Sequence, residues 1–230
     1  MFVLLFSLVF GGAIEPTDGS SYREFLMGGI FAMTMLLGGI FTASGLAEDM
    51  QLGIIDRFRS LPMSRAAVLI GRTASDVMYN VLSLIVMSLT GLLTGWRIHS
   101  SALNAIAGSA LLLLFAYAFS WVMAYIGLLV PSPEVVNNSS YLVIMPLTFL
   151  SNAFVPLESF SGILRHIVEW NPVSAVTQAA RELFGNTHST ALTSGAWSLQ
   201  HPVAYSLIWA AAFVGVFLPM SVHQYRRANG

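Results

Sequence analysis

The 230-residue chain contains no cysteine and no lysine, so its ten basic residues are all arginine. Without cysteine there is no disulfide, no thiolate metal site and no cysteine nucleophile. Without lysine there is no Schiff-base chemistry and no Walker A lysine to hold a phosphate. Any ATP hydrolysis on which this protein depends would therefore take place on another chain. A net charge of −1 also gives no basic surface for nucleic acid.

Charge is scarce as well. Charged residues make up 9% of the chain and hydrophobic residues 56%, whereas a soluble domain carries roughly a quarter of charged residues. The charges gather between apolar runs, several of which reach about 18 residues, the length that crosses a bilayer core about 30 Å thick. The sequence predicts an all-α fold, a polytopic membrane helix bundle.

We expect about six transmembrane helices. The apolar opening, residues 1–14, would be about 21 Å long as a helix, which is too short for a span. We interpret it as the outer part of a truncated first span whose cytoplasmic beginning is absent from this chain. The other spans are expected at about 25–47, 67–94, 103–130, 141–155 and 203–222, with Pro146 breaking the short fifth one.

The arginines predict the orientation of these spans, because cytoplasmic loops carry an excess of basic residues. If the spans alternate in direction, one side of the membrane receives Arg57, Arg59, Arg65, Arg72, Arg226 and Arg227. The opposite side receives Arg23, Arg97, Arg165 and Arg181. We therefore expect a multi-pass protein of the cell membrane with both termini in the cytoplasm.

The most polar segment between two spans is DRFRSLPMSR, residues 56–65. Ile54, Ile55, Phe58 and Leu61 recur at helical spacing, which predicts a short amphipathic helix that ends at Pro62. It is either an interfacial helix that anchors topology against anionic lipid, or a docking surface for a soluble partner. The residues of that candidate surface are Asp56, Arg57, Phe58, Arg59, Ser60, Leu61 and Pro62.

Two further patterns lie within the spans. Arg72 and Asp76 are four residues apart, so one helical turn brings them together as an intramembrane ion pair. We favour a structural role for this pair. Thr34, Gly38 and Thr42 fall on one helix face, and small residues at this spacing let another helix approach closely.

The segment between the fifth and sixth spans, 156–201, predicts two short amphipathic helices on the outer side. Pro156 and Glu158 mark the end of the fifth span, although Glu158 could also belong to a substrate path. Asn171 is the expected N-cap of the second helix, Pro172 its first residue, and Arg181 lies near its end. The two helices form either a re-entrant hairpin or a pair that lies flat on the outer leaflet.

The sequence offers no catalytic constellation. Its five histidines are far apart in loops and at span ends, and no HExxH motif occurs. Ser44 has no histidine partner at a similar depth in a span, which a serine nucleophile would require. We expect no catalytic, cofactor-binding or metal-binding residue on this chain.

The segment EDMQLGIIDRFRSLPMSRAAVLIGR, the stretch FLSNAFVPLESFSGILRHIVEWNPVSAVTQAARELFGN and a last span with a short basic tail together resemble one known family. They are similar to the membrane subunits of ABC-2 type transporters, in particular the drug-resistance branch similar to the daunorubicin exporter permease. The resemblance covers nearly the whole chain. One departure is that the family usually begins with a cytoplasmic amphipathic helix, which is absent here.

The resemblance implies that residues 1–230 form one transmembrane domain, with 48–66 as a cytoplasmic coupling loop. Its coupling helix would fit a groove on a separate ATPase subunit, which would bind the ATP and magnesium. The chain would form a homodimer or pair with a similar permease in the lipid bilayer. It would export a hydrophobic drug-like or lipid-like substrate and so confer antibiotic resistance. The glycine face of the second span and the fifth span are our candidates for the subunit interface and export path.

Two other functions remain as alternatives. An ion-coupled secondary transporter or channel typically has unpaired acidic residues or broken helices near the membrane midplane, and commonly an internal repeat. The acidic residues of this chain fall at span ends, and its halves do not mirror one another. A non-transporting membrane assembly subunit is compatible with the composition.

Overall fold

The computed structural model describes residues 22–52, 65–130, 132–187 and 195–227, with the backbone alone at 65–70, 72, 226 and 227. Within these ranges the fold contains helices and no strand, which confirms the predicted all-α class. The helices are α2 (Tyr22–Gln51), α4 (Arg65–Leu93), α5 (Ala102–Leu129), α6 (Pro133–Phe149), the 3₁₀ helix η1 (Leu157–Ser159), α7 (Gly162–Trp170), α8 (Pro172–Phe184), α9 (Trp197–Gln200) and α10 (Pro202–Arg227).

Four of the described helices are long and apolar enough to cross a membrane. They correspond to α2, to Thr73–Leu93 within α4, to α5, and to Pro202–Tyr225 within α10. These are the second, third, fourth and sixth of the predicted spans. The predicted first span lies outside the described residues.

The predicted fifth span is wrong in its boundaries. Helix α6 begins at Pro133, eight residues before the expected start at Tyr141, because the Ser132 side chain caps the Val135 amide and Pro133 suits the first turn. Pro146 lies inside α6 and does not end it, since the helix continues to Phe149. With 17 residues, α6 is about 25 Å long.

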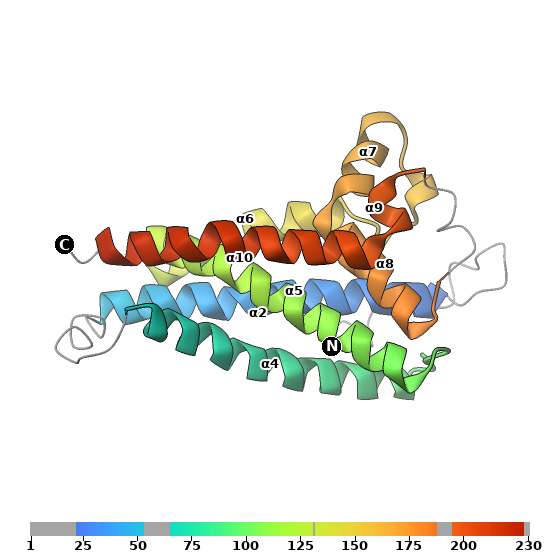
Figure 1. Ribbon diagram of the computed structural model, residues 1–230, viewed down its shortest axis with the longest axis horizontal. Coiled ribbons are helices and arrows are strands. Elements are labelled where there is room, and N and C mark those ends of the chain that lie inside the picture. Colours follow the sequence, from blue (N-terminus) through green and yellow to red (C-terminus); the bar gives the residue numbers. More distant parts are fainter. Residues whose placement is uncertain (1–21, 53–64, 131, 188–194, 228–230) are drawn as a thin grey trace.

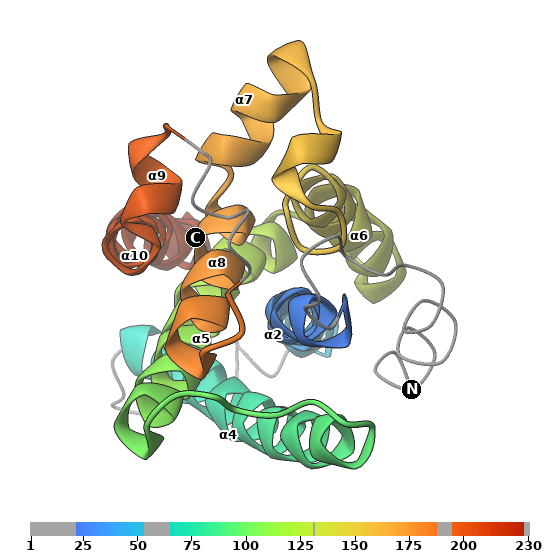
Figure 2. The same ribbon diagram turned by 90° about the vertical axis from the view of Figure 1, so that its right-hand side faces the viewer.

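Helix α2 is the central element of the bundle. It packs against α4, α5, α6 and α8, and Figure 2 shows these helices on different sides of it. Helix α10 packs against α5 and α8 on the far side. In Figure 1 one end of the bundle carries α7, α8 and α9, and we call it the α8 end. At the opposite end α2 finishes, α4 begins and α10 finishes, and we call it the 53–64 end.

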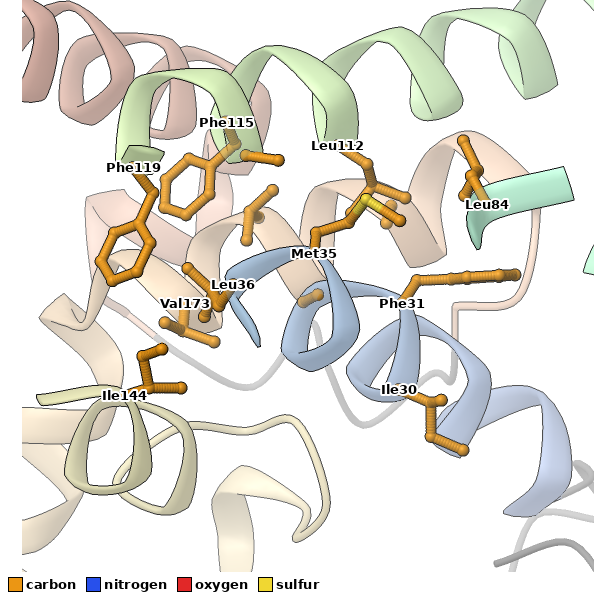
Figure 3. Packing of buried hydrophobic residues seen from close by; sticks show 14 of the residues in the cluster. Ile30, Phe31, Met35, Leu36, Leu84, Leu112, Phe115, Phe119, Ile144 and Val173 are labelled. Carbon is orange, nitrogen blue, oxygen red and sulfur yellow. The ribbon is translucent and has the colours of Figure 1, made fainter. Parts of the chain in front are cut away.

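The hydrophobic core lies around the middle of α2. Phe31 and Leu36 of α2 meet Leu112 and Phe115 of α5, and Ile144 closes the core from α6 (Figure 3). In the most apolar stretch of each helix, 83% of the α2 residues are buried, against 28% in α4 and 17% in α10. Helices α4 and α10 therefore present wide apolar faces outside the bundle, as helices in contact with lipid or a second subunit do.

Candidate functional site

The predicted coupling surface, Asp56 to Pro62, lies outside the described residues. The helices that flank it are described: α2 ends at Gln51 and α4 begins at Arg65. Both of these helix ends lie at the 53–64 end of the bundle, where the last turns of α10 also lie (Figure 1). A movement applied to that loop would act first on α2 and α4.

Two residues of the predicted packing face of α2 lie against α4. The Thr42 hydroxyl donates a hydrogen bond to the Asp76 carboxylate. Gly38 leaves room for the Asn80 side chain, because a Cβ at position 38 would overlap the Asn80 Oδ1 atom. Thr34, the third residue of that face, is partly buried. The Arg72 side chain is not described, so the Arg72–Asp76 ion pair stays a prediction.

The buried face of α4 changes character along its length. Of the side chains described between residues 71 and 80, the buried ones are the polar Thr73, Asp76 and Asn80. Toward the α8 end they are Leu84 and Gly91. The outward face of α4 is apolar, with exposed Met78, Leu82, Ile85, Val86, Leu89 and Leu93. We call the contact of Thr73, Asp76 and Asn80 with Gly38 and Thr42 the polar seam.

Asn80 is the anomaly within the polar seam. Its side chain is only 3% exposed, and its Oδ1 atom is buried without a hydrogen-bond partner. A buried acceptor left unpaired costs about 1–3 kcal/mol relative to one that is satisfied. Unpaired groups of this kind are rare in native proteins, and they call for a functional or structural reason.

At the α8 end, Arg181 connects three separate parts of the chain. It is fully buried on α8, and its Nε donates to the Phe25 carbonyl of α2 at 2.9 Å. Its Nη2 donates to the carbonyls of Asn152 and Ala153 at 2.9 and 3.0 Å. Both of these carbonyls belong to the segment that follows α6. One guanidinium therefore fixes α8, α2 and the α6–η1 connection relative to one another.

The Arg181 side chain also contacts an aromatic ring. Its guanidinium lies over the Phe25 ring, 3.6 Å from the centroid, where a cation–π contact is favourable. Burial lowers the pKa of Arg181 to about 9, and attraction to the ionised form of Tyr22 partly opposes that effect. The side chain is thus still protonated at neutral pH. Gly28 makes the approach possible, because a Cβ there would lie 2.8 Å from Arg181 Cγ.

Asn171 joins the end of α6 to the start of α8. Its Oδ1 accepts from the Val173 amide at 2.7 Å, which is the N-cap that the sequence predicts. Its Nδ2 donates to the carbonyls of Leu147 and Leu150 at 2.8 and 2.7 Å, where α6 ends. Pro172 occupies the first position of α8. These bonds satisfy backbone groups at two helix ends with one side chain.

The two outer helices differ in their surroundings. Helix α8 is buried from Pro172 to Arg181. Helix α7 projects from the bundle (Figures 1 and 2) and exposes Ile163, Leu164, Ile167 and Trp170. Pro156 and Glu158 lie at η1, and Glu158 is exposed. The protein itself thus covers α8 and leaves the apolar face of α7 open to its surroundings.

A third connection at the α8 end joins the α4–α5 loop to the end of α8. The buried Trp96 packs edge-on against Phe31 and Phe184, and its Nε1 donates to Asn186 Oδ1 at 3.0 Å. Asn186 Nδ2 in turn donates to the Arg97 carbonyl at 2.8 Å. The α8 end of α4 is therefore fixed to the rest of the bundle.

In the described ranges no three histidine or acidic side chains come together as metal ligands would. Among the described side chains, His99 lies 2.8 Å from Glu24 and His166 lies 3.3 Å from Glu169. The described features are contacts between helices: side chains connect the helices closely at the α8 end, and the polar seam lies toward the other end.

Comparison with known proteins identifies the family. The family model for the ABC-2 type transporter matches residues 1–184. The chain belongs to the ABC-2 type transporter family. It is 34% identical over 229 residues to the "Daunorubicin resistance ABC transporter permease protein" of Streptomyces coeruleorubidus, covering 100% of this chain and 77% of that protein. It is 23% identical over 230 residues to a Mycobacterium tuberculosis protein named "Probable doxorubicin resistance ABC transporter permease protein", covering 79% of its length.

Several residues that make important tertiary contacts in this ABC-2 chain were not predicted from the sequence. Asn80 is an ordinary polar residue in an apolar run, and only its position four residues after Asp76 hints at a shared face. Trp96 and Asn186 meet across 90 residues of sequence, and no local pattern predicts such a contact. The sequence did single out Arg181, without the three carbonyls that hold it.

Proposed function

We propose that this chain is the transmembrane subunit of an ATP-driven exporter, energised by a separate ATPase subunit, that moves a hydrophobic drug-like or lipid-like substrate out of the cell. The observation that carries the proposal is the match to drug-resistance ABC transporter permeases over the whole chain. The chain itself would hydrolyse nothing. ATP and magnesium would be bound by the partner, through the P-loop lysine that this sequence lacks.

The positions of the helices next to the coupling loop support this assignment, because these helices could transmit a movement of the ATPase. The two helices that flank residues 53–64 are α2, the most buried of the four candidate membrane spans, and α4, one of the two less buried ones. Closure of two ATPase subunits around ATP would move the coupling loop and, through it, the ends of α2 and α4. The Arg181 connections would keep the α8 end together during that movement. ATP binding and hydrolysis on the partner would shift the balance between two such arrangements, and this chain would carry out no chemistry itself.

Two copies of this subunit, or one copy and a similar permease, would form the transport path in the cell membrane. The apolar outer faces of α4 and α10 suit contact with lipid or with such a partner. Both termini and the coupling loop would face the cytoplasm, in keeping with the arginine distribution. Helix α7 would then lie at the outer surface of the membrane.

Transport by inside-out membrane vesicles tests the proposal. Vesicles would be prepared from cells that make the protein and from a strain that lacks it, and fluorescent daunorubicin would serve as the first probe. We expect ATP-dependent uptake only in the first preparation, and we expect a protonophore to leave that uptake unchanged. A set of unrelated hydrophobic dyes would then define the substrate range.

Two outcomes would overturn the proposal. Uptake that needs no ATP and collapses with the protonophore would favour the ion-coupled secondary transporter. If no hydrophobic probe and no lipid analogue is taken up by vesicles in which the protein is present and folded, the assembly-subunit function would replace it.

A further inference from the structure

Two arginines converge on the end of α4 that lies at the α8 end of the bundle. Arg23, in the first turn of α2, donates from Nη1 to the Thr94 carbonyl at 3.3 Å. Arg97, in the loop after α4, donates from Nη1 to the Leu92 carbonyl at 2.6 Å and to the Trp96 carbonyl at 2.9 Å. Because the last carbonyls of a helix point along its axis, the two guanidiniums lie close together beyond the end of α4. We call Arg23 and Arg97 the arginine pair.

The arginine pair has no carboxylate partner among the described side chains. The carboxylate of Glu24, the neighbour of Arg23 in the chain, lies 2.8 Å from His99 instead. The described hydrogen bonds of both arginines use Nη1 alone, so the Nη2 group of each can serve a further acceptor. Arg23 Nε is in addition buried without a partner. Protein acceptors in the described ranges therefore satisfy only part of the arginine pair.

The other described arginine side chains at the α8 end are already engaged. Arg165 pairs with Glu169 at 3.1 Å, and Arg181 donates to three buried carbonyls. Positive charge left over at this end of the bundle is therefore concentrated on the arginine pair, where it also lies at the negative end of the α4 helix dipole.

The arginine pair lies at a boundary of the membrane. The candidate span of α2 begins at Tyr22, one residue before Arg23, and the candidate span of α4 ends at Leu93, four residues before Arg97. Lipid head groups lie just outside the hydrocarbon core that such spans cross. Guanidiniums bind phosphate groups with two parallel hydrogen bonds each. A lipid phosphate is therefore an acceptor of suitable chemistry at the depth of the arginine pair.

An apolar stripe runs along α4 from the same helix end. Its residues recur at helical spacing and are all exposed: Leu82, Ile85, Val86, Leu89 and Leu93. The stripe is about 16 Å long at 1.5 Å per residue, which is about half of the 30 Å hydrocarbon core and so the thickness of one leaflet. Figure 2 shows α4 at the edge of the bundle, with no described helix on its outer side. Acyl chains could thus lie along the stripe from the arginine pair to the middle of the membrane.

We propose that the arginine pair and the apolar stripe of α4 form a binding site for an anionic phospholipid. The two guanidiniums hold the phosphate of the lipid beyond the end of α4, and the acyl chains lie along the stripe. Phosphatidylcholine carries a cation next to its phosphate, which the arginine pair repels, so the site prefers phosphatidylglycerol. The bound lipid also links α2 to the loop after α4, because each supplies one arginine. The site requires only that the chain lies in a membrane, and neither transport nor an ATPase.

Fluorescence quenching by lipids with brominated acyl chains tests the site along the stripe. The chain contains no cysteine, so a single introduced thiol can carry the fluorophore. Val86→Cys places it on the stripe, and Ile208→Cys places it on α10 as the matched control. Both side chains are 53% exposed, and they lie a similar distance from the span ends Leu93 and Pro202. The full chain would be reconstituted in vesicles that contain brominated phosphatidylglycerol or brominated phosphatidylcholine at equal mole fraction.

We expect phosphatidylglycerol to be preferred over phosphatidylcholine at Val86→Cys by about tenfold in relative affinity, since each arginine near a charged head group contributes about a factor of five. At Ile208→Cys the two lipids should quench equally. Arg23→Gln and Arg97→Gln should each reduce the preference at Val86→Cys by about fivefold. Arg165→Gln removes the same charge at the α8 end and should leave the preference unchanged.

Three results would overturn the lipid site. Equal quenching by both lipids at Val86→Cys refutes it without any arginine variant, so the test holds even if those variants fail to fold. The same preference at Ile208→Cys would show a general attraction of the protein for charged lipid. A preference at Val86→Cys that Arg97→Gln leaves intact would show that the arginine pair does no more than cap α4.

Inorganic phosphate separates a bound lipid from a free anion. Thermal unfolding of the full chain in detergent would be measured with added phosphatidylglycerol, phosphatidylcholine or inorganic phosphate. Phosphatidylglycerol at ten times its dissociation constant should raise the melting temperature by about 2–4 °C, and the other two additions should leave it unchanged. Arg97→Gln should abolish the rise. An equal rise with inorganic phosphate would show that the arginine pair binds a free anion, and would overturn the lipid site.

Discussion

Replacement of Arg181 by methionine tests how much its hydrogen bonds at the α8 end contribute to the stability of the fold. Methionine keeps an unbranched chain of similar length but removes the donors to the Phe25, Asn152 and Ala153 carbonyls. The Phe25 carbonyl lies within α2, so a backbone hydrogen bond of the helix can still satisfy it. The two carbonyls after α6 lose a donor, at about 1–3 kcal/mol each. Relief from burying a charge offsets part of this loss, so the net destabilisation is about 2–4 kcal/mol.

The assay is thermal unfolding of the purified protein in one fixed detergent or lipid nanodisc. For a chain of this size, such a loss corresponds to a melting temperature about 5–15 °C lower. Arg165→Met is the matched control, because Arg165 pairs with Glu169 at 3.1 Å on the projecting α7 and is partly exposed. Glu169 keeps His166 at 3.3 Å when Arg165 is replaced, so the control should melt closer to wild type than Arg181→Met does.

Arg181→Lys should fall between wild type and Arg181→Met. A lysine keeps the charge, but it cannot reach three carbonyls with the planar fork of a guanidinium. If Arg181→Met melts with wild type, or if Arg165→Met is equally destabilised, the account of Arg181 as the connection between α8, α2 and the segment after α6 is wrong.

Two further predictions concern contacts of α2. Gly29→Ala should sharply reduce the yield of folded protein, because a Cβ there would overlap the Ala153 carbonyl, whereas Gly71→Ala, with nothing within 4 Å, should be neutral in a detergent-solubility assay. Thr42→Val keeps the side-chain shape but removes the hydrogen bond to Asp76, so it should destabilise the contact between α2 and α4 by about 1–3 kcal/mol. That loss should appear as a lower melting temperature of the purified protein in the same detergent, and an unchanged melting temperature would show that this hydrogen bond does not stabilise the fold.

The sequence predicted most of the fold because long apolar runs carry a strong signal. Helices α2, α5 and α10 follow directly from their length and composition. The start of α6 was misplaced because Asn137, Asn138, Ser139 and Ser140 look like a loop. In the structure Val136 and Ser140 are buried against neighbouring helices, and the Ser132–Pro133 cap, itself readable in the sequence, sets the true start.

The candidate site was less accessible to sequence reasoning. The N-cap at Asn171 is a local signal and was predicted. The left-handed Gly185 that ends α8, with φ 75°, is a local signal of the same kind. Tertiary contacts decide that α8 is buried and that α7 is exposed. Alanines 175, 179 and 180 are fully buried on α8, and their small size lets it pack closely within the bundle. The unpaired oxygen of Asn80 is visible only once α2 and α4 are placed together.

The central claim is that a separate ATPase docks on the loop between α2 and α4 and powers this chain. Affinity purification from native membranes in mild detergent, followed by mass spectrometry for a P-loop ATPase, tests that claim most directly. The comparison needs wild type, Arg57→Glu/Arg59→Glu, and the charge-matched control Arg226→Glu/Arg227→Glu. We expect the ATPase with wild type and the control and its loss from the loop variant. Folded preparations that all lack an ATPase would contradict the claim, and an ATPase retained by all three would show that these arginines do not form its docking surface.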